Sequence, residues 1–292
     1  MQEVLIPATT QAEIDEEIAQ RTMSHQATMA RLQAAAEHAA SLSLNVDKTR
    51  AKVLLAAGDS WFDYPLHGNG PPFDRTDIIA QLEVLGDNPP IILNLAHLGD
   101  ATTAIMSLPK QQRMIRALRE PKNWPATGKP DAILFSGGGN DIAGDQFCIF
   151  LDYAAPGVSG LNARRFELML GAVQASYLDL FEFRDRYAPG VPIIAHCYDF
   201  PIPNGRHPAC AGPWLKPSLQ YCNWTVAQGT QIVRQALVAF RTMLSDLAAA
   251  KTNNFHLVDT QGLLNAADWA NELHPYPAGF LTFAKAFAKV LP

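Results

Sequence analysis

The chain alternates between short apolar runs and longer segments with helical periodicity. The apolar runs are nearly continuous and, after the first, follow Gly, Pro or Asn, a pattern typical of strands buried on both faces of a parallel sheet. The predicted strands are Lys52–Ala57, Ile91–Ala96, Asp131–Ser136, Pro192–Cys197 and Phe255–Val258.

The segments between these runs carry apolar residues three and four positions apart, which predicts amphipathic helices. The predicted helices are residues 11–40, Asp77–Leu85, Thr102–Arg119, Ala163–Tyr187, Thr225–Ala250 and Tyr276–Val290. Strands that alternate with helices over connections this long are joined as parallel neighbours by right-handed crossovers. The expected fold class is therefore α/β, with a three-layer doubly wound sheet of about five parallel strands.

The first predicted helix precedes the first strand and supplies no chemical motif. Its apolar stripe consists of Ile14, Ile18, Met29, Leu32, Ala36 and Ala39, interrupted by Thr22 and His25. Thr10 and Glu13 have capping-box spacing at its start. Two interpretations stay open: a helix packed on the domain's own surface, or an arm that forms a homodimer. In either case we expect activity to be largely independent of residues 1–45.

Composition narrows the class of protein. The 292 residues are 48% hydrophobic and 17% charged, which is ordinary for a globular protein. A net charge of −5 without any basic stripe gives no electrostatic basis for binding nucleic acid. No apolar run approaches the roughly 18 residues of a membrane span. The N-terminus is acidic where a signal peptide is basic, so the chain as given is expected to be cytoplasmic, with secretion left open if a leader was removed.

The four cysteines predict neither a zinc site nor a redox motif, because no C-x-x-C pair occurs among them. Cys197 lies in an apolar strand and is expected to be buried. Cys210 and Cys222 bracket a loop and could pair, although the expected reducing compartment disfavours a disulfide.

Four predicted strands are followed by residues that could carry chemistry. In a parallel sheet, ligands bind beyond the carboxyl ends of the strands. The blocks that meet at this edge are Gly58-Asp59-Ser60-Trp61, His97-Leu98-Gly99-Asp100, Gly137-Gly138-Gly139-Asn140-Asp141 and, after the last strand, Asp268 to Pro275. A Ser, a Gly, an Asn and a His thus arrive in order. They could supply a nucleophile, two oxyanion donors and a general base for acyl transfer.

In order and position these blocks resemble those of the SGNH hydrolases, the GDSL-type esterase and lipase superfamily. Gly58-Asp59-Ser60 matches the nucleophile block, Gly99 the lone glycine of the second block, Gly138–Asp141 the G-x-N-D block and His274 the closing histidine. The resemblance spans roughly residues 52 to 290. It implies a flavodoxin-like hydrolase domain over residues 51–292, after an N-terminal helical extension over residues 1–50, and ester hydrolysis without a cofactor or metal.

The resemblance also implies roles for individual residues. Ser60 would attack the ester carbonyl, and His274 would act as general base. The backbone N–H groups of Ser60 and Gly99 and the side chain of Asn140 would hold the oxyanion. Taken singly, Ser60 could be only a helix cap, and Gly99 and Asn140 only turn residues. Asp59 and Asp141 are expected to accept hydrogen bonds from backbone amides.

One position departs from the family pattern. The residue three before the closing histidine is usually Asp, and here it is Asn271. An amide oxygen can orient an imidazole but cannot balance the charge of an imidazolium. Asp268 or Glu272 could supply that charge, or the enzyme could work as a Ser–His dyad braced by a backbone carbonyl. Asn271 is thus the candidate for the acid position, with Asp268 as the alternative.

Aromatic residues are dense around the predicted site. Trp61, Phe62, Tyr64 and Phe147 are the candidate substrate-binding residues, with core packing as the alternative for about half of such aromatics. The expected function is a serine esterase or lipase acting on a small-molecule ester. The alternatives are a carbohydrate or other O-deacetylase of the same fold, and a catalytically weak binding protein, which Asn271 favours.

Overall fold

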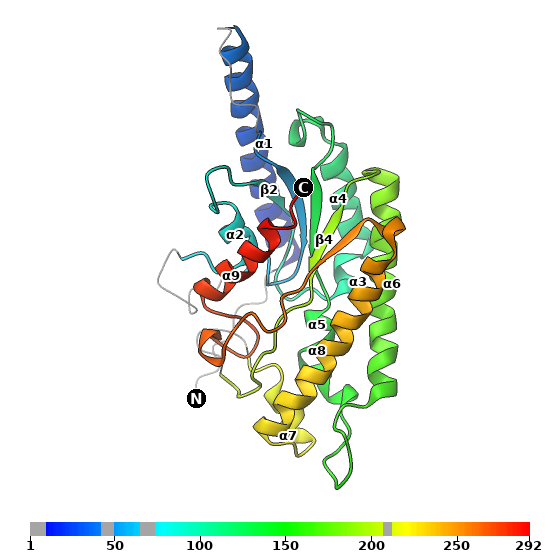
Figure 1. The fold of residues 1–292 in the computed structure, drawn as a ribbon. Helices are drawn as coiled ribbons and strands as arrows, with labels where there is room; N and C mark the ends of the chain where they lie inside the picture. The colour runs from blue at the N-terminus through cyan, green and yellow to red at the C-terminus, as the bar shows by residue number, and fades with distance from the viewer. Residues whose placement is uncertain (1–9, 42–49, 65–73, 207–211) are drawn as a thin grey trace.

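A computed structural model describes residues 10–41, 50–64, 74–206 and 212–292 (Figure 1). Its five strands form one parallel sheet in the order β2-β1-β3-β4-β5. The strands are β1 (Val53–Gly58), β2 (Ile91–Asn94), β3 (Ala132–Ser136), β4 (Ile193–His196) and β5 (Phe255–Val258). This is the flavodoxin-like order. The predicted fold class is confirmed, and each strand lies where the sequence places it, within about two residues.

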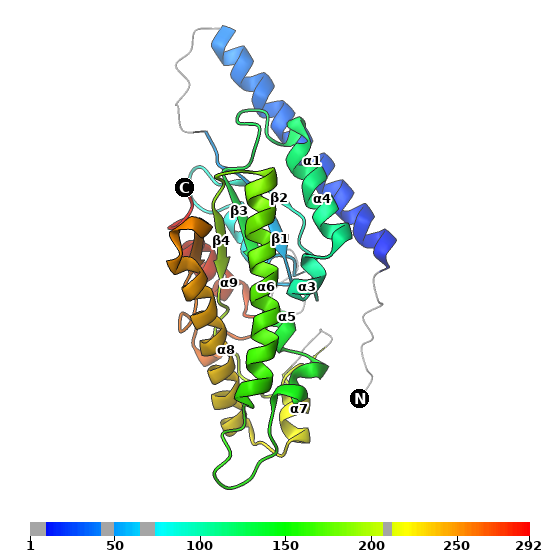
Figure 2. The same cartoon turned by 90° about the vertical axis from the view of Figure 1, so that its right-hand side faces the viewer.

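Helices cover both faces of the sheet (Figures 1 and 2). α4, α6 and α8 pack on one side, whereas α2 and α9 pack together on the other. The helices are α1 (Gln11–Ser41), α2 (Ile78–Leu82), α3 (Thr102–Ile105), α4 (Leu108–Arg119), α5 (Gly139–Ile142), α6 (Ala163–Tyr187), α7 (Lys216–Tyr221), α8 (Val226–Ala249) and α9 (Pro277–Ala288). Short 3-10 turns are η2 (Pro121–Asn123), η3 (Asp145–Phe150), η4 (Lys251–Asn253) and η5 (Ala266–Asp268).

Two helical features differ from the prediction. The single helix expected over Thr102–Arg119 is broken into α3 and α4 at Ser107, whose backbone is extended. Pro109 explains the break, because proline lacks an N–H and is tolerated only in the first turn of a helix. The second feature is α7, which lies within a Pro- and Gly-rich stretch that sequence periodicity did not mark as helical.

Helix α1 lies along the edge strand β2 and η2. Ile14, Ile18, His25 and Met29 are buried, so surface packing is confirmed for this half of the helix, and His25 belongs to the stripe that it was expected to interrupt. Beyond Met29 the predicted stripe fails, because most of residues 30–41 are exposed. In Figure 1 this end of α1 extends past the sheet. Pairing with a second copy there stays a prediction.

The structure describes two of the three cysteines considered above, and the burial predicted for Cys197 is confirmed. Cys197 is buried, and Cys222 is a buried free thiol. Cys210 lies outside the described residues. Within the described ranges, no helix is long and apolar enough to cross a membrane.

The centre of the sheet is packed so tightly that β1 must end in glycine. Every residue of β1 is buried, and the strand is paired with β3 as far as Gly58 and Ser136. A Cβ atom on residue 58 would lie 2.6 Å from the carbonyl oxygen of Ser136. This close approach fixes the position at which β1 ends and at which the next residues, Asp59 and Ser60, leave the sheet.

We therefore expect Gly58→Ala to lower the free energy of unfolding by about 1–3 kcal/mol, because the added methyl forces β1 and β3 apart. Gly171→Ala is the matched control. Gly171 lies in α6, and no atom lies within 4 Å of the place that a methyl group would take there, so alanine should be neutral or stabilise by up to about 1 kcal/mol. Urea denaturation of both variants measures the difference. Equal stabilities would contradict the packing argument.

Candidate active site

The structure brings Ser60 and His274 into direct contact. Ser60 lies in the turn after β1, and His274 lies in the turn before α9, next to a bridge between Trp269 and Pro275. The Ser60 Oγ is 2.7 Å from the His274 Nε2. Both side chains face a pocket, yet the residues are only 8% and 4% exposed. The geometry is that of a hydroxyl hydrogen-bonded to a general base.

Asn271 determines which ring nitrogen of His274 carries the proton. Its Oδ1 accepts hydrogen bonds from the backbone N–H groups of Leu273 and His274, each at 2.9 Å. These bonds fix the amide with its oxygen toward the ring, 3.3 Å from the His274 Nδ1. Because an amide oxygen only accepts, Nδ1 must donate. Nε2 is thereby left to accept the Ser60 proton, as a general base requires.

Neither alternative carboxylate pairs with His274. Asp268 caps η5 by accepting a hydrogen bond from the backbone N–H of Asn265 at 2.7 Å. The helical turn that would have carried its carboxylate to the histidine face does not form, because η5 ends at Asp268. The structure thus places Asn271, and not Asp268, beside the His274 Nδ1, and its role as the third member of the site stays a prediction.

Glu272 has a different task. Its buried carboxylate accepts hydrogen bonds from the backbone N–H groups of Gly205, Trp214, Leu215 and Lys216, at 2.7–3.1 Å. The Glu272 side chain thus binds the backbone at Gly205 and again at residues 214–216. This hydrogen bonding uses the carboxylate to order a loop, so it is not free to balance an imidazolium.

Burial keeps the candidate base neutral. Desolvation lowers the pKa of His274 to about 3, because an imidazolium in an apolar setting loses its hydration. The Tyr64 ring stacks on the imidazole with the ring centroids 4.1 Å apart. The Tyr64 hydroxyl also accepts a hydrogen bond from the Asn271 Nδ2 at 2.9 Å. Tyr64 therefore braces the base and the residue that orients it.

Besides Ser60, the candidate oxyanion residues are Asn140 and Gly99, which lie on two linked segments. Asn140 is in α5 and lines the pocket with Ser60. Its Nδ2 donates to the backbone carbonyl of Asp100 at 3.0 Å, which ties α5 to the turn that contains Gly99. Gly99 has φ +82°, a conformation that favours glycine. Asp141 accepts from the backbone N–H of Thr102 at 2.9 Å, as expected for an amide-capping residue.

Asp59 lies at the centre of a buried polar network beneath Ser60. It accepts hydrogen bonds from the backbone N–H of Trp61 at 3.0 Å, as predicted, and also from the Ser136 hydroxyl at 2.7 Å and the Tyr198 hydroxyl at 2.5 Å. Burial nevertheless raises the pKa of Asp59 to about 6. The three donors hold the residue that precedes the nucleophile in one position.

His196 completes this network, and the sequence reasoning did not assign it a role. Its Nδ1 accepts from the backbone N–H of Tyr198 at 3.2 Å, so its Nε2 donates to the Ser136 hydroxyl at 2.8 Å, which in turn donates to Asp59. Burial lowers the pKa of His196 to about 3, which keeps the ring neutral for this arrangement. The one signal in the sequence was its position at the carboxyl end of β4, the edge where the other site residues gather.

The pocket beside Ser60 is narrow, with a volume of about 40 Å³. Apart from its polar residues and Gly139, it is formed by aliphatic side chains and by Trp61, Trp269 and Tyr198. The aliphatic lining includes Ile142, Ala143, Pro201, Leu215, Val233, Leu237 and Leu273. Such a site is shaped for a small apolar group.

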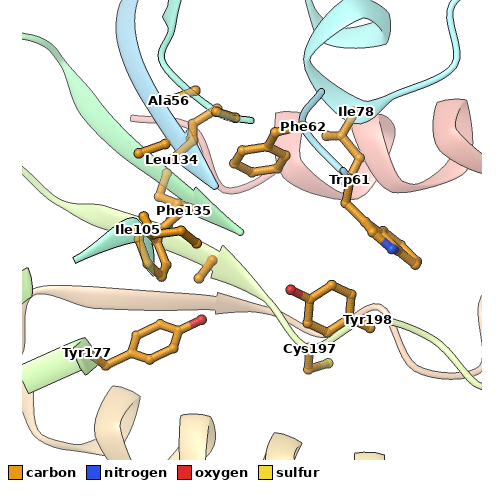
Figure 3. Packing of buried hydrophobic residues seen from close by; sticks show 14 of the residues in the cluster. Ala56, Trp61, Phe62, Ile78, Ile105, Leu134, Phe135, Tyr177, Cys197 and Tyr198 are labelled. Atoms are coloured by element: carbon orange, nitrogen blue, oxygen red, sulfur yellow. The ribbon is translucent and has the colours of Figure 1, made fainter. Parts of the chain in front are cut away.

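Only Trp61, among the four predicted substrate-binding aromatics, lines this pocket. Phe62 and Phe147 are fully buried in the hydrophobic core, and Figure 3 shows Phe62 among core residues that include Ile78 and Leu134. Tyr64 is buried against His274. Phe62 and Phe147 pack in the core because neighbouring side chains such as Trp61 and Phe62 point in different directions, and only one of the two reaches the pocket.

The described residues contain no group of three or more His, Cys, Asp or Glu side chains that could hold a metal ion. The polar residues that line the pocket with Ser60 are Asp59, Asn140, Tyr198, Asp199 and His274.

Comparison with known proteins identifies the fold. No protein-family model and no curated protein sequence matches the chain. Among solved structures, a lipase from a goat rumen metagenome superposes with a TM-score of 0.54 at 14% identity, over 82% of this chain and 97% of that one. An extracellular lipase from Streptomyces rimosus gives a TM-score of 0.49 at 15% identity, over 82% and 99% of the two chains. A member of the lipolytic G-D-S-L family from Veillonella parvula gives 0.45 at 16% identity, over 82% and 98%. The chain shares its α/β fold with the lipase from the goat rumen metagenome.

Replacing Asn271 by Asp tests the unusual acid position. The carboxylate can keep both backbone hydrogen bonds, and the Tyr64 hydroxyl can rotate to donate to it. The carboxylate introduced by Asn271→Asp should raise the pKa of His274, because a nearby negative charge favours the imidazolium. By stabilising the imidazolium formed during attack, the substitution should increase kcat/KM at neutral pH by about tenfold or more, since loss of this charge is costly in serine proteases.

The pH dependence of kcat/KM shows whether Asn271→Asp raises the pKa of His274. With a His274 pKa of about 3, the wild type should keep its kcat/KM as pH falls from 8 to about 5, whereas Asn271→Asp should lose activity at a higher pH as the imidazole protonates. Asp268→Asn is the control and should leave the profile unchanged. A profile unaltered in Asn271→Asp would contradict the role of Asn271.

Proposed function

We propose that this protein is a serine hydrolase that cleaves esters of short acyl groups. The observation that carries the proposal is the buried Ser60–His274 hydrogen bond of 2.7 Å, with the tautomer of His274 set by Asn271. The fold supports it, since the GDSL-type lipases and esterases place their chemistry on the same scaffold.

In the proposed reaction, the Ser60 Oγ attacks the ester carbonyl carbon while its proton passes to the His274 Nε2. The carbonyl oxygen becomes an oxyanion held by the backbone N–H groups of Ser60 and Gly99 and by the Asn140 amide. The intermediate collapses, the bond to the alcohol oxygen breaks, and His274 returns the proton to that oxygen. A water molecule then attacks the acyl group on Ser60 by the same route and releases the carboxylic acid.

Among the described residues, no carboxylate is hydrogen-bonded to the His274 ring, and this has a consequence for rate. The imidazolium must be stabilised by the neutral Asn271 oxygen and by the face of the Tyr64 ring, which attracts cations. We therefore expect an enzyme with a modest turnover number whose base remains unprotonated in mildly acidic solution. A fully silent binding protein would need no hydrogen bond between Ser60 and a correctly oriented imidazole.

The first test is covalent labelling. A fluorophosphonate probe should react with the wild type at Ser60, because its phosphorus centre requires both an activated nucleophile and an oxyanion site. Ser60→Ala should abolish labelling and ester turnover with little change in melting temperature. Peptide mapping locates the label. Labelling that survives in Ser60→Ala, or a wild type that never labels between pH 5 and about 9, would refute the proposed function.

The second test is acyl-chain length. A pocket of about 40 Å³ holds only a few heavy atoms, so kcat/KM on p-nitrophenyl esters should be highest for acetyl to butyryl and fall steeply beyond. Leu237→Ala removes part of the wall contributed by α8 and should shift the optimum toward longer chains by about two to three carbons, since each buried CH₂ contributes about 0.8 kcal/mol.

Leu244→Ala is the matched control for this test. Leu244 is a buried leucine of the same helix that does not line the pocket. Its truncation should cost a similar amount of stability, about 2–5 kcal/mol, and leave the optimum in place. A long-chain optimum in the wild type would contradict the short-acyl assignment without affecting the labelling test.

A further inference from the structure

A single arginine of α1 reaches both segments that carry the proposed reaction. The Arg21 Nη2 donates to the Asp63 carboxylate at 2.6 Å, and its Nη1 donates to the backbone carbonyl of Ala96 at 3.1 Å. The Glu17 side chain, one turn earlier on α1, also pairs with Arg21. The side chains of Arg21 and Asp63 are 24% and 11% exposed. The ion pair is therefore partly shielded from water and stronger than a surface pair.

These two contacts lie at chemically important places along the chain. Asp63 is three residues after the nucleophile Ser60 and directly before Tyr64. Ala96 lies three residues before Gly99. The forked guanidinium therefore bridges the nucleophile segment and the segment with the backbone oxyanion donor.

The side chain of Asn94 in β2 also connects the nucleophile segment with the segment that leads to Gly99. The Asn94 Nδ2 donates to the carbonyl of Phe62 at 2.7 Å, and its Oδ1 accepts from the backbone N–H of Ala96 at 3.0 Å. Asn94 thus joins the same two segments that Arg21 joins from α1. The position of Asp63 is determined by both.

Tyr64 transmits the position of Asp63 to the base. Its ring lies against His274 with centroids 4.1 Å apart and an angle of 26° between the planes. Its hydroxyl bonds to Asn271, whose oxygen orients the His274 Nδ1. A shift of Asp63 would therefore move the ring on which the imidazole rests.

We propose that Arg21 is a positioning residue for the active site, and that α1 is thereby a working part of the catalytic domain. The proposal rests on the function proposed above. It reverses the expectation from sequence that residues 1–45 are dispensable for activity. Arg21 acts by holding the Ser60–Tyr64 segment against the Gly99 turn, and it contacts no substrate.

The positive charge of Arg21 stabilises the Asp63 carboxylate in its present position. Burial raises the pKa of Asp63, and the nearby Arg21 guanidinium opposes this rise. Without Arg21, the Asp63 carboxylate would be left in a partly desolvated place without its ion partner, which disfavours its present position. The segment would then relax toward water and carry Tyr64 with it.

The competing explanation is that Arg21 merely attaches α1 to the body of the protein. The chain offers a matched control for it, because Asp15 of the same helix pairs with Arg113 of α4. That ion pair also fastens α1, but neither residue bonds to the nucleophile segment or the Gly99 turn within the described contacts. Asp15→Asn should therefore weaken the docking of α1 without disturbing Tyr64.

The test compares Arg21→Met, Arg21→Lys and Asp15→Asn in the full-length protein with a p-nitrophenyl acetate substrate. Arg21→Met should lower kcat by about 10- to 100-fold, as expected for a displaced catalytic group, with KM changed by less than about threefold because the acyl pocket does not include Arg21. Arg21→Lys keeps the charge but lacks the fork, so it should recover part of kcat. Asp15→Asn should keep kcat within about twofold of the wild type, with a smaller loss of melting temperature than Arg21→Met, because the Asp15 side chain is more exposed.

A second measurement reads the position of the base without turnover. In the wild type, the stacked Tyr64 ring should shift the His274 Cε1 proton upfield in the NMR spectrum. Arg21→Met should remove much of that shift, and Asp15→Asn should retain it. An unchanged His274 resonance in Arg21→Met would overturn the proposal, as would a loss of kcat in Asp15→Asn equal to that in Arg21→Met. If the wild type proves inactive, the proposed function fails, while the His274 resonance still decides whether Arg21 positions the base.

Discussion

The site depends on keeping an imidazole neutral and correctly oriented inside the protein. His274 is buried, its pKa falls to about 3 because an imidazolium there would lose its hydration, and the group beside its Nδ1 is an amide. Burial favours the uncharged ring, whereas the Asn271 amide orients the ring without supplying the negative charge that would balance an imidazolium. The arrangement provides an unprotonated base at neutral pH, but it stabilises the imidazolium only weakly after the proton has been accepted.

The remaining architecture can be understood as the support of this pair of residues. The tight approach of β1 and β3 at Gly58 sets the height of Ser60. Beneath it, Asp59 is held by three donors, and the neutral ring of His196 fixes the direction of one of them. On the other side, Glu272 uses its carboxylate to order the segment around Trp214, whose ring contacts His274 edge-on. Buried polar groups that are fully paired in this way specify one conformation.

Helix α1 illustrates how an N-terminal extension can pack on an α/β domain without contributing a sequence motif. Its stripe from Ile14 to Met29 covers the edge strand β2, whose outer side would otherwise be free to pair with another chain. The same helix face carries Arg21 to the junction between two active-site segments. One helix therefore covers a sheet edge and contacts the two segments that we propose it organises.

The sequence determined the order of strands and helices, the carboxyl edge as the place of chemistry, and Ser60 and His274 as partners. Buried parallel strands leave continuous apolar runs, and the residues that follow them must meet at one edge. The sequence could not show that Asn271, rather than Asp268, faces the imidazole, because that choice depends on where a 3-10 turn ends. Nor could it separate Trp61, which lines the pocket, from Phe62 and Phe147, which fill the core, since all three are apolar aromatics near the same strands. The roles of His196 and Arg21 also arose only in the tertiary structure. Each of these two acts through hydrogen bonds to residues more than 40 positions away, and local sequence does not encode such separations.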